Sequence, residues 1–134
     1  MNTYAAGEDR TKRILVVDDE ADFRDILSKI LQLEGFSTET AADGSEALGL
    51  MSNGRSYDLV LSDINMPVLD GLELLAEIRR KHAGVKVILI TGTGVRCADG
   101  AEAVLPKPVD FGSLLENINA ALGGGGRKAL ALNA

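Results

Sequence analysis

The sequence predicts an α/β domain in which helices cover both faces of a parallel sheet. Short continuous aliphatic runs, typical of strands buried on both sides of such a sheet, alternate with segments whose apolar residues repeat at helical spacing. The chain has 134 residues, of which 46% are hydrophobic and 25% charged. This composition suits one globular domain with a substantial core.

Five segments have the pattern of strands. Residues 13–18, 58–63 and 85–91 each contain an aliphatic run that ends in a polar side chain. Residues 101–105 give a weaker version of this pattern, followed by a proline. Residues 37–41 are short and rich in Thr, so we expect an edge strand there.

Four apolar stripes with spacings of three and four residues predict helices. Asp43, Asp70 and Asp110 stand where helices should start, and Gly35 and Gly54 where helices should end. Asp43 and Asp70 are each followed three residues later by Glu, the spacing of a capping box. The four stripes are Phe23, Ile26, Leu27, Ile30 and Leu31; Ala47, Leu48 and Met51; Leu74, Leu75 and Ile78; and Phe111, Leu114, Leu115, Ile118 and Leu122.

These elements follow one another as β-α-β-α-β-α-β-x-β-α. The connection x, residues 91–100, carries three glycines and no apolar stripe, and a crossover with its helix needs at least about 10–12 residues. We expect a loop there, or at most one or two helical turns. The sequence therefore predicts a flavodoxin-like five-stranded parallel sheet of order 2-1-3-4-5, with the fourth helix short or absent.

The domain is expected over residues 13–122, between a flexible arm over residues 1–12 and a flexible Gly-rich tail over residues 123–134. No aliphatic run approaches the ~20 residues of a membrane span, and the first 13 residues lack the apolar stretch of a signal peptide. We therefore expect a cytoplasmic protein without membrane contact.

Charge and composition exclude several kinds of site. The net charge of −6 argues against a nucleic-acid surface, which would need a basic stripe. Cys97 and His82 are the sole cysteine and histidine, which rules out a disulfide framework and a nitrogen- or sulfur-based metal site. Any metal is expected to be bound by oxygen.

Polar side chains follow the predicted strands at their carboxyl ends, where ligands bind in such a sheet. Asp18 and Asp19 end the first strand, Asp63 the third, Thr91 the fourth and Lys107 the fifth. One such residue alone has an ordinary explanation, such as Asp19 capping a helix. Three carboxylates at one rim repel one another unless a cation such as Mg²⁺ lies among them. With Lys and Thr donors facing the metal, this set predicts phosphoryl transfer to a carboxylate.

This set of residues resembles the receiver domain of two-component response regulators, over residues 14–122. The spacing D-x-x-M-P-x-x-D-G after an apolar strand is the most specific part of the resemblance. The matching positions are Asp18, Asp19, Asp63, Met66, Pro67, Asp70, Gly71, Thr91, Gly92, Lys107 and Pro108.

The resemblance implies that Asp63 accepts a phosphoryl group from the phosphohistidine of a sensor histidine kinase or a histidine phosphotransfer protein. The domain would catalyse its own phosphorylation and dephosphorylation, and signal to a downstream protein partner. Mg²⁺ would be bound directly by Asp19, Asp63 and the backbone carbonyl of Asn65, with Asp18 acting mainly through metal-bound water. Lys107 would bridge to the phosphoryl group.

Further roles are implied around this centre. Thr91 would hydrogen-bond the phosphoryl group, and Gly92 would leave room beside it. The Lys107–Pro108 peptide would be cis. Asn65 and Thr93 occupy positions that tune the lifetime of the aspartyl phosphate in this family.

The chain departs from the family pattern in two places. The interval between Thr91 and Lys107 is short, and Val104 stands where many members carry Tyr or Phe as a rotamer switch. Val cannot swing between buried and exposed rotamers as a ring does, so the usual relay from Thr91 to an aromatic side chain is not expected.

Two alternatives stay open at this stage. The first is a flavin-binding electron carrier of the same fold, although Tyr4, Tyr57 and the absence of Trp leave few rings to stack a flavin. The second is a pseudo-receiver that acts as an interaction module without phosphorylation. The sequence also leaves open whether the domain stands alone or was part of a longer chain, and it does not name the kinase or the output partner.

Overall fold

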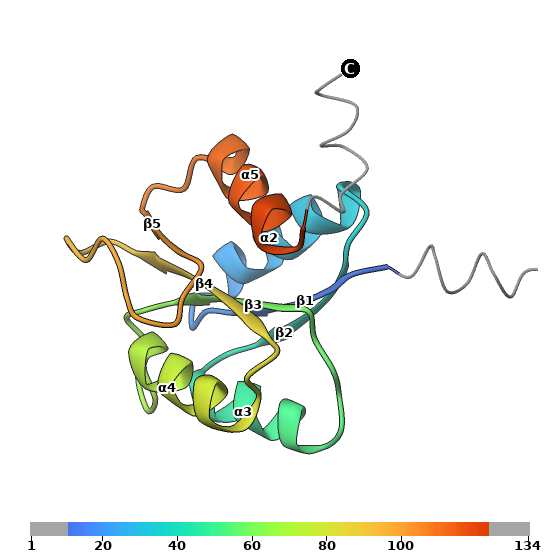
Figure 1. Ribbon diagram of the computed structural model, residues 1–134. Helices are drawn as coiled ribbons and strands as arrows, with labels where there is room; N and C mark the ends of the chain where they lie inside the picture. The colour runs from blue at the N-terminus through green and yellow to red at the C-terminus, as the bar shows by residue number, and fades with distance from the viewer. Residues whose placement is uncertain (1–10, 124–134) are drawn as a thin grey trace, which may run out of the picture.

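A computed structural model describes residues 11–123 of the protein (Figure 1). All five strands are parallel and pair in the order β2-β1-β3-β4-β5, which confirms the predicted fold class. The expected arm and tail lie almost entirely outside the described residues. The elements are β1 (Arg13–Val17), α2 (Ala21–Leu33), β2 (Ser37–Ala41), α3 (Gly44–Ser52), β3 (Leu59–Asp63), α4 (Gly71–Lys81), β4 (Lys86–Thr91), β5 (Ala103–Pro106) and α5 (Phe111–Ala121).

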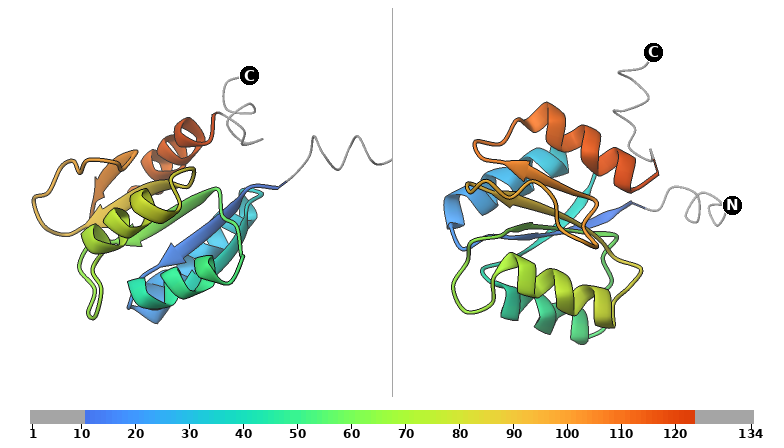
Figure 2. Two further views of the ribbon diagram at one scale, coloured as in Figure 1. Left: turned by 60° about the horizontal axis from the view of Figure 1, so that its bottom comes forward. Right: turned by 60° about the vertical axis from the view of Figure 1, so that its left-hand side comes forward.

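Helices α2 and α5 cover one face of the sheet, and α3 and α4 cover the other (Figure 2). Alternate residues of β1, β3 and β4 enter two separate apolar clusters, so the central strands are buried on both faces. Every residue of β3 is buried, as the continuous aliphatic run predicts. None of the described helices is both long enough and apolar enough to cross a membrane.

The α2 stripe is narrower than the sequence predicts. Leu27 and Leu31 are fully buried, but Ile26 is 52% exposed. Ser28 is buried instead, because α2 packs against the edge strand β2 and the Ser28 hydroxyl hydrogen-bonds Thr38 Oγ1 at 2.6 Å. The face of α2 that packs on the sheet edge therefore contains both apolar and polar side chains, and Ile26 lies outside this face.

The predicted helix caps are present. Asp70 and Glu73 form a full capping box at the start of α4. Asp43 accepts a hydrogen bond from the Glu46 N–H, whereas the Glu46 side chain accepts from Ala42 rather than completing the box. Asp110 caps α5.

The connection between β4 and β5 has no helix in residues 92–102. It contains a turn at residues 99–100, and β5 begins two residues later than predicted, at Ala103. Ala98 and Ala101 pack against the cluster beneath α3 and α4. Small apolar side chains of this connection therefore cover the sheet where a crossover helix would otherwise lie.

Gly71 brings the first turn of α4 against the end of β3. A Cβ at this position would lie 2.4 Å from the Asp63 carbonyl oxygen and 2.7 Å from the Ile64 Cα. The Gly71 N–H also donates to the Ile64 carbonyl at 2.8 Å. The absence of a side chain therefore sets the distance between α4 and the backbone of Asp63.

Gly71→Ala should lower the free energy of unfolding by about 1–3 kcal/mol, because the new methyl group meets backbone that cannot move aside cheaply. Gly49→Ala is the matched control, since a Cβ at this exposed position in α3 meets nothing within 4 Å. It should raise the free energy of unfolding by roughly 0.5–1 kcal/mol. Urea unfolding of both variants measures the difference, and equal effects would contradict the close-approach argument.

Candidate functional site

The structure brings the predicted site residues together at the carboxyl ends of β1, β3, β4 and β5. Oxygens of Asp18, Asp19 and Asp63 lie within 4.8 Å of one another. Lys107 Nζ lies 3.0 Å from Asp63 Oδ2 and 3.8 Å from Asp18 Oδ2. Residues from three separate parts of the chain thus share one charged centre.

Asp63, at the end of β3, is held by contacts to both carboxylate oxygens. Oδ1 accepts a hydrogen bond from the Asn65 N–H at 3.2 Å, and Oδ2 accepts one from Lys107 Nζ at 3.0 Å. The residue is 6% exposed. The Asp63 carboxylate therefore faces the site with a fixed orientation.

Asp18 is more deeply buried than Asp63, with 2% of the residue exposed. Its Oδ1 accepts from the Glu20 N–H at 2.8 Å, and its backbone carbonyl accepts from Arg24 Nη1 at 2.8 Å. Burial raises the pKa of the Asp18 carboxyl, and the negative charge of Asp63 adds to this rise. The Glu20 N–H and Lys107 oppose the shift without cancelling it.

Lys107 stays charged despite its partial burial. Burial by itself lowers the pKa of the ammonium, but the hydrogen bond and charge of Asp63, together with the charges of Asp18 and Glu20, outweigh it, so the pKa is raised. The peptide bond to Pro108 is cis, as the resemblance implies. The Lys107 N–H donates to the Thr91 carbonyl at 2.8 Å, which ties the end of β5 to the end of β4.

Thr91 lies at the edge of the site, and the residue is 1% exposed. Its hydroxyl makes the polar contacts. It donates to Asn65 Oδ1 at 3.4 Å and shares a 2.8 Å hydrogen bond with Thr93 Oγ1. The Thr93 N–H donates to Thr91 Oγ1 at 3.0 Å. Thr91 is therefore linked to the loop that follows β4.

Asp19 is the exposed carboxylate of the three. The alternative role of Asp19 as a helix cap is wrong, because Glu20 occupies the N-cap position of α2 and makes no side-chain cap hydrogen bond. Asp19 is thus free of the backbone of α2 and faces the acidic cluster.

The cluster has the composition of a hard-cation site. Its donors are all carboxylate oxygens, two buried and one exposed, and Lys107 brings one positive charge against three negative charges. A small divalent cation would relieve the remaining repulsion, and Mg²⁺ prefers oxygen ligands and retains water on an open side.

Two features of the site have no signal in the sequence. The Phe23 ring lies beneath the Lys107 ammonium, 4.9 Å from Nζ to the ring centroid, although the sequence marks Phe23 only as part of an apolar stripe. Val68 has a φ of 73°, a left-handed conformation that β-branched residues rarely adopt. The Leu69 N–H donates to the Pro67 carbonyl at 2.9 Å across this turn.

Comparison with known proteins identifies a family for this chain. The family profile for the response regulator receiver domain matches residues 14–119. The CpxR homolog of Haemophilus influenzae, a transcriptional regulatory protein, is 41% identical over 116 residues, which cover 82% of this chain and 50% of that protein. The chain spans about half the length of this relative and of the similar MprA response regulators from Mycobacterium.

Solved structures agree. A CheY-like receiver domain protein from Methanospirillum hungatei superposes with a TM-score of 0.77 at 35% identity, covering 84% of this chain and 94% of the other. The response regulator TrrA from Thermotoga maritima, solved in complex with Mg²⁺-BeF, has a TM-score of 0.77 at 40% identity and covers 84% of this chain and 100% of its own. The chain therefore belongs to the receiver domains of two-component response regulators.

Proposed function

We propose that this receiver domain is a phosphoacceptor switch in which Asp63 takes the phosphoryl group. The observation that carries the proposal is the setting of Asp63, whose carboxylate is oriented by Asn65 and Lys107 and lies within the acidic cluster. A carboxylate fixed in this way is a suitable nucleophile for in-line transfer.

The donor is the phosphohistidine of a sensor histidine kinase or of a histidine phosphotransfer protein. An Asp63 carboxylate oxygen forms a bond to phosphorus while the phosphorus–nitrogen bond of the donor breaks. The bonding electrons leave with the imidazole, which returns to its neutral form with a proton from water. The match covers only half of the CpxR homolog, so the function of that whole protein does not identify a partner for this chain. We propose the downstream partner only as a protein that binds the phosphorylated state.

Negative charge at the site must be balanced during transfer. Mg²⁺, when bound by Asp19, Asp63 and the Asn65 carbonyl, with Asp18 acting through a water molecule, would neutralise charge on the phosphoryl oxygens. Lys107 supplies a further positive charge next to Asp63. Thr91 supplies a hydroxyl that can donate a hydrogen bond to a phosphoryl oxygen.

Two alternative functions can be distinguished from this proposal. Membership of the receiver family sets aside the flavin-binding electron carrier. A pseudo-receiver would share the family and the fold but would take no phosphoryl group, so direct detection of the modification distinguishes the two.

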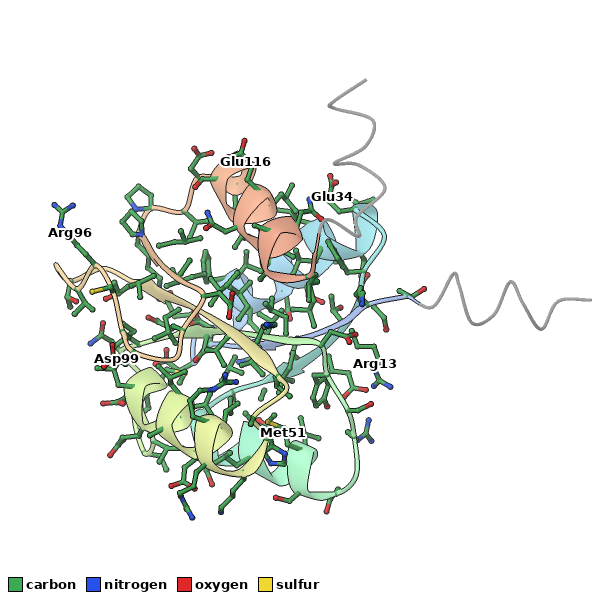
Figure 3. The ribbon with its side chains drawn as sticks, in the orientation of Figure 1. Arg13, Glu34, Met51, Arg96, Asp99 and Glu116 are labelled. Atoms are coloured by element: carbon green, nitrogen blue, oxygen red, sulfur yellow. The ribbon has the colours of Figure 1, made fainter. Side chains whose placement is uncertain are left out.

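The response is proposed to leave the site through residues 92–102. The Thr91 hydroxyl has one proton, so donating it to a phosphoryl oxygen ends its donation to Asn65 or Thr93. Residues 92–97 are exposed, and Figure 3 shows Arg96 pointing away from the sheet. A partner would then read the rearranged loop together with α5.

Incubation with acetyl phosphate and Mg²⁺ should add the mass of one phosphoryl group, as measured by intact mass spectrometry. Asp63→Asn should abolish the addition, because an amide is not a nucleophile of comparable strength. Asp43→Asn is the matched control, since Asn keeps the N-cap of α3. Modification that persists in Asp63→Asn, or a wild-type protein that takes none, would contradict the assignment.

Millimolar Mg²⁺ should raise the melting temperature by a few degrees, equivalent to roughly 1–2 kcal/mol, because the metal binds the folded state alone. Asp19→Asn should raise the melting temperature without metal, by relieving repulsion, and should lose most of the Mg²⁺ response. Asp22→Asn, which removes an exposed acid from the first turn of α2 outside the cluster, should keep that response. Equal responses in all three proteins would refute the metal assignment.

Amide hydrogen exchange should be fast in residues 92–100 of the unmodified protein and slower once a phosphoryl mimic and Mg²⁺ are bound. Ordering is expected because Thr91, moving toward the phosphoryl group, draws the loop with it, an order–disorder switch. Residues 86–91 of β4 serve as an internal control and should stay protected in both states. Strong protection of the loop before binding would mean that the signal leaves by another face.

A further inference from the structure

The contacts to carboxylates leave part of the Lys107 side chain unrestrained. Its ammonium lies 3.0 Å from Asp63 and 3.8 Å from Asp18, yet the side chain is 27% exposed. A lysine ammonium is a strongly hydrated point charge on a flexible four-carbon stem. Water therefore competes with the two carboxylates for the ammonium on its open side.

An aromatic ring occupies another side of the ammonium. The Lys107 Nζ lies over the ring of Phe23, 4.9 Å from its centroid, and at this distance the negative face of a ring attracts a cation. Phe23 stands in the first turn of α2, is partly buried and packs against the apolar cluster between the sheet and helices α2 and α5. The core therefore holds the ring in place while the ring faces Lys107.

We propose that Phe23 is a positioning residue of the phosphoryl-transfer site, whose ring fixes the Lys107 ammonium beside Asp63. The proposal rests on the function proposed above, because it concerns the group that neutralises phosphoryl charge. An aliphatic side chain at this position would fill the same space without attracting the cation. The ring thus joins the start of α2 to the end of β5 through Lys107.

Two other roles for Phe23 must be separated from this one. The first turn of α2 lines a surface hollow of about 370 Å³ together with the exposed Ile26, so a protein partner could contact the ring there. The ring also contributes to the core. Phosphorylation by a small phosphodonor needs no protein partner, so its rate does not report on partner contact at Phe23. Phe36, which belongs to the same cluster, controls for the contribution of a phenylalanine to the core.

The kinetic test uses the rate of Asp63 phosphorylation by acetyl phosphate at saturating Mg²⁺, measured by intact mass. Phe23→Leu should slow this rate about two- to fivefold, the size expected of a partly exposed cation–π contact. Phe23→Tyr should restore it, and Phe36→Leu, assayed where the variant is fully folded, should leave it unchanged. An unchanged rate in Phe23→Leu would overturn the proposal.

A double-mutant cycle shows whether Phe23 acts through Lys107. In a Lys107→Ala background, Phe23→Leu should cause no further slowing, because the ammonium that the ring positions has been removed. The same two- to fivefold slowing in both backgrounds would mean that the ring acts by another route and would overturn the proposal.

A measurement on the unphosphorylated protein separates this inference from the proposed function. The Lys107 Hε and Hζ resonances should be shifted upfield by the ring current, lose the shift in Phe23→Leu and regain it in Phe23→Tyr. Lys107 protons without a ring-dependent shift would overturn the role of Phe23. A protein that shows the shift but takes no phosphoryl group would overturn the proposed function while supporting the contact.

Discussion

The interaction on which the site depends is the contact of the Lys107 ammonium with two buried carboxylates. Oxygens of three carboxylates lie within 4.8 Å of one another, and Lys107 brings one positive charge, so repulsion remains in the folded state. Burial raises the pKa of the Asp18 carboxyl, and the negative charge of Asp63 adds to this rise. Two apolar clusters, one on each face of the sheet, supply the stability that holds these charges in place.

Four of the polar residues at the rim, Asp18, Asp63, Thr91 and Lys107, contact a second element through their backbone. Arg24 of α2 donates to the Asp18 carbonyl, the Thr91 carbonyl accepts from the Lys107 N–H, and α4 approaches the Asp63 carbonyl at Gly71. The backbone of the site is therefore rigid on several sides. Backbone contacts of this kind are few in residues 92–102, the segment through which the response is proposed to leave the site.

The sequence predicts which side chains meet at this rim, because parallel strands place their carboxyl ends at one edge and a polar residue follows the aliphatic runs of the central strands. The same reasoning fails where contacts cross between elements. Helical periodicity assigns Ile26 and Phe23 to one apolar stripe, yet the structure exposes Ile26 and sets the Phe23 ring against Lys107. The left-handed backbone at Val68 is likewise not predictable from the sequence, since Val rarely adopts that conformation.

The short β4–β5 connection has a consequence for how the domain can respond. Val104 is partly buried and, with Thr93, Gly94, Val95, Arg96 and Pro106, lines a hollow of about 300 Å³ beside the sheet. Val104 has no aromatic ring to move in or out, and the Thr91 hydroxyl is joined to this hollow by its hydrogen bond to Thr93. Under the function proposed above, Thr93 is therefore the residue through which a change in the Thr91 hydroxyl would reach this hollow.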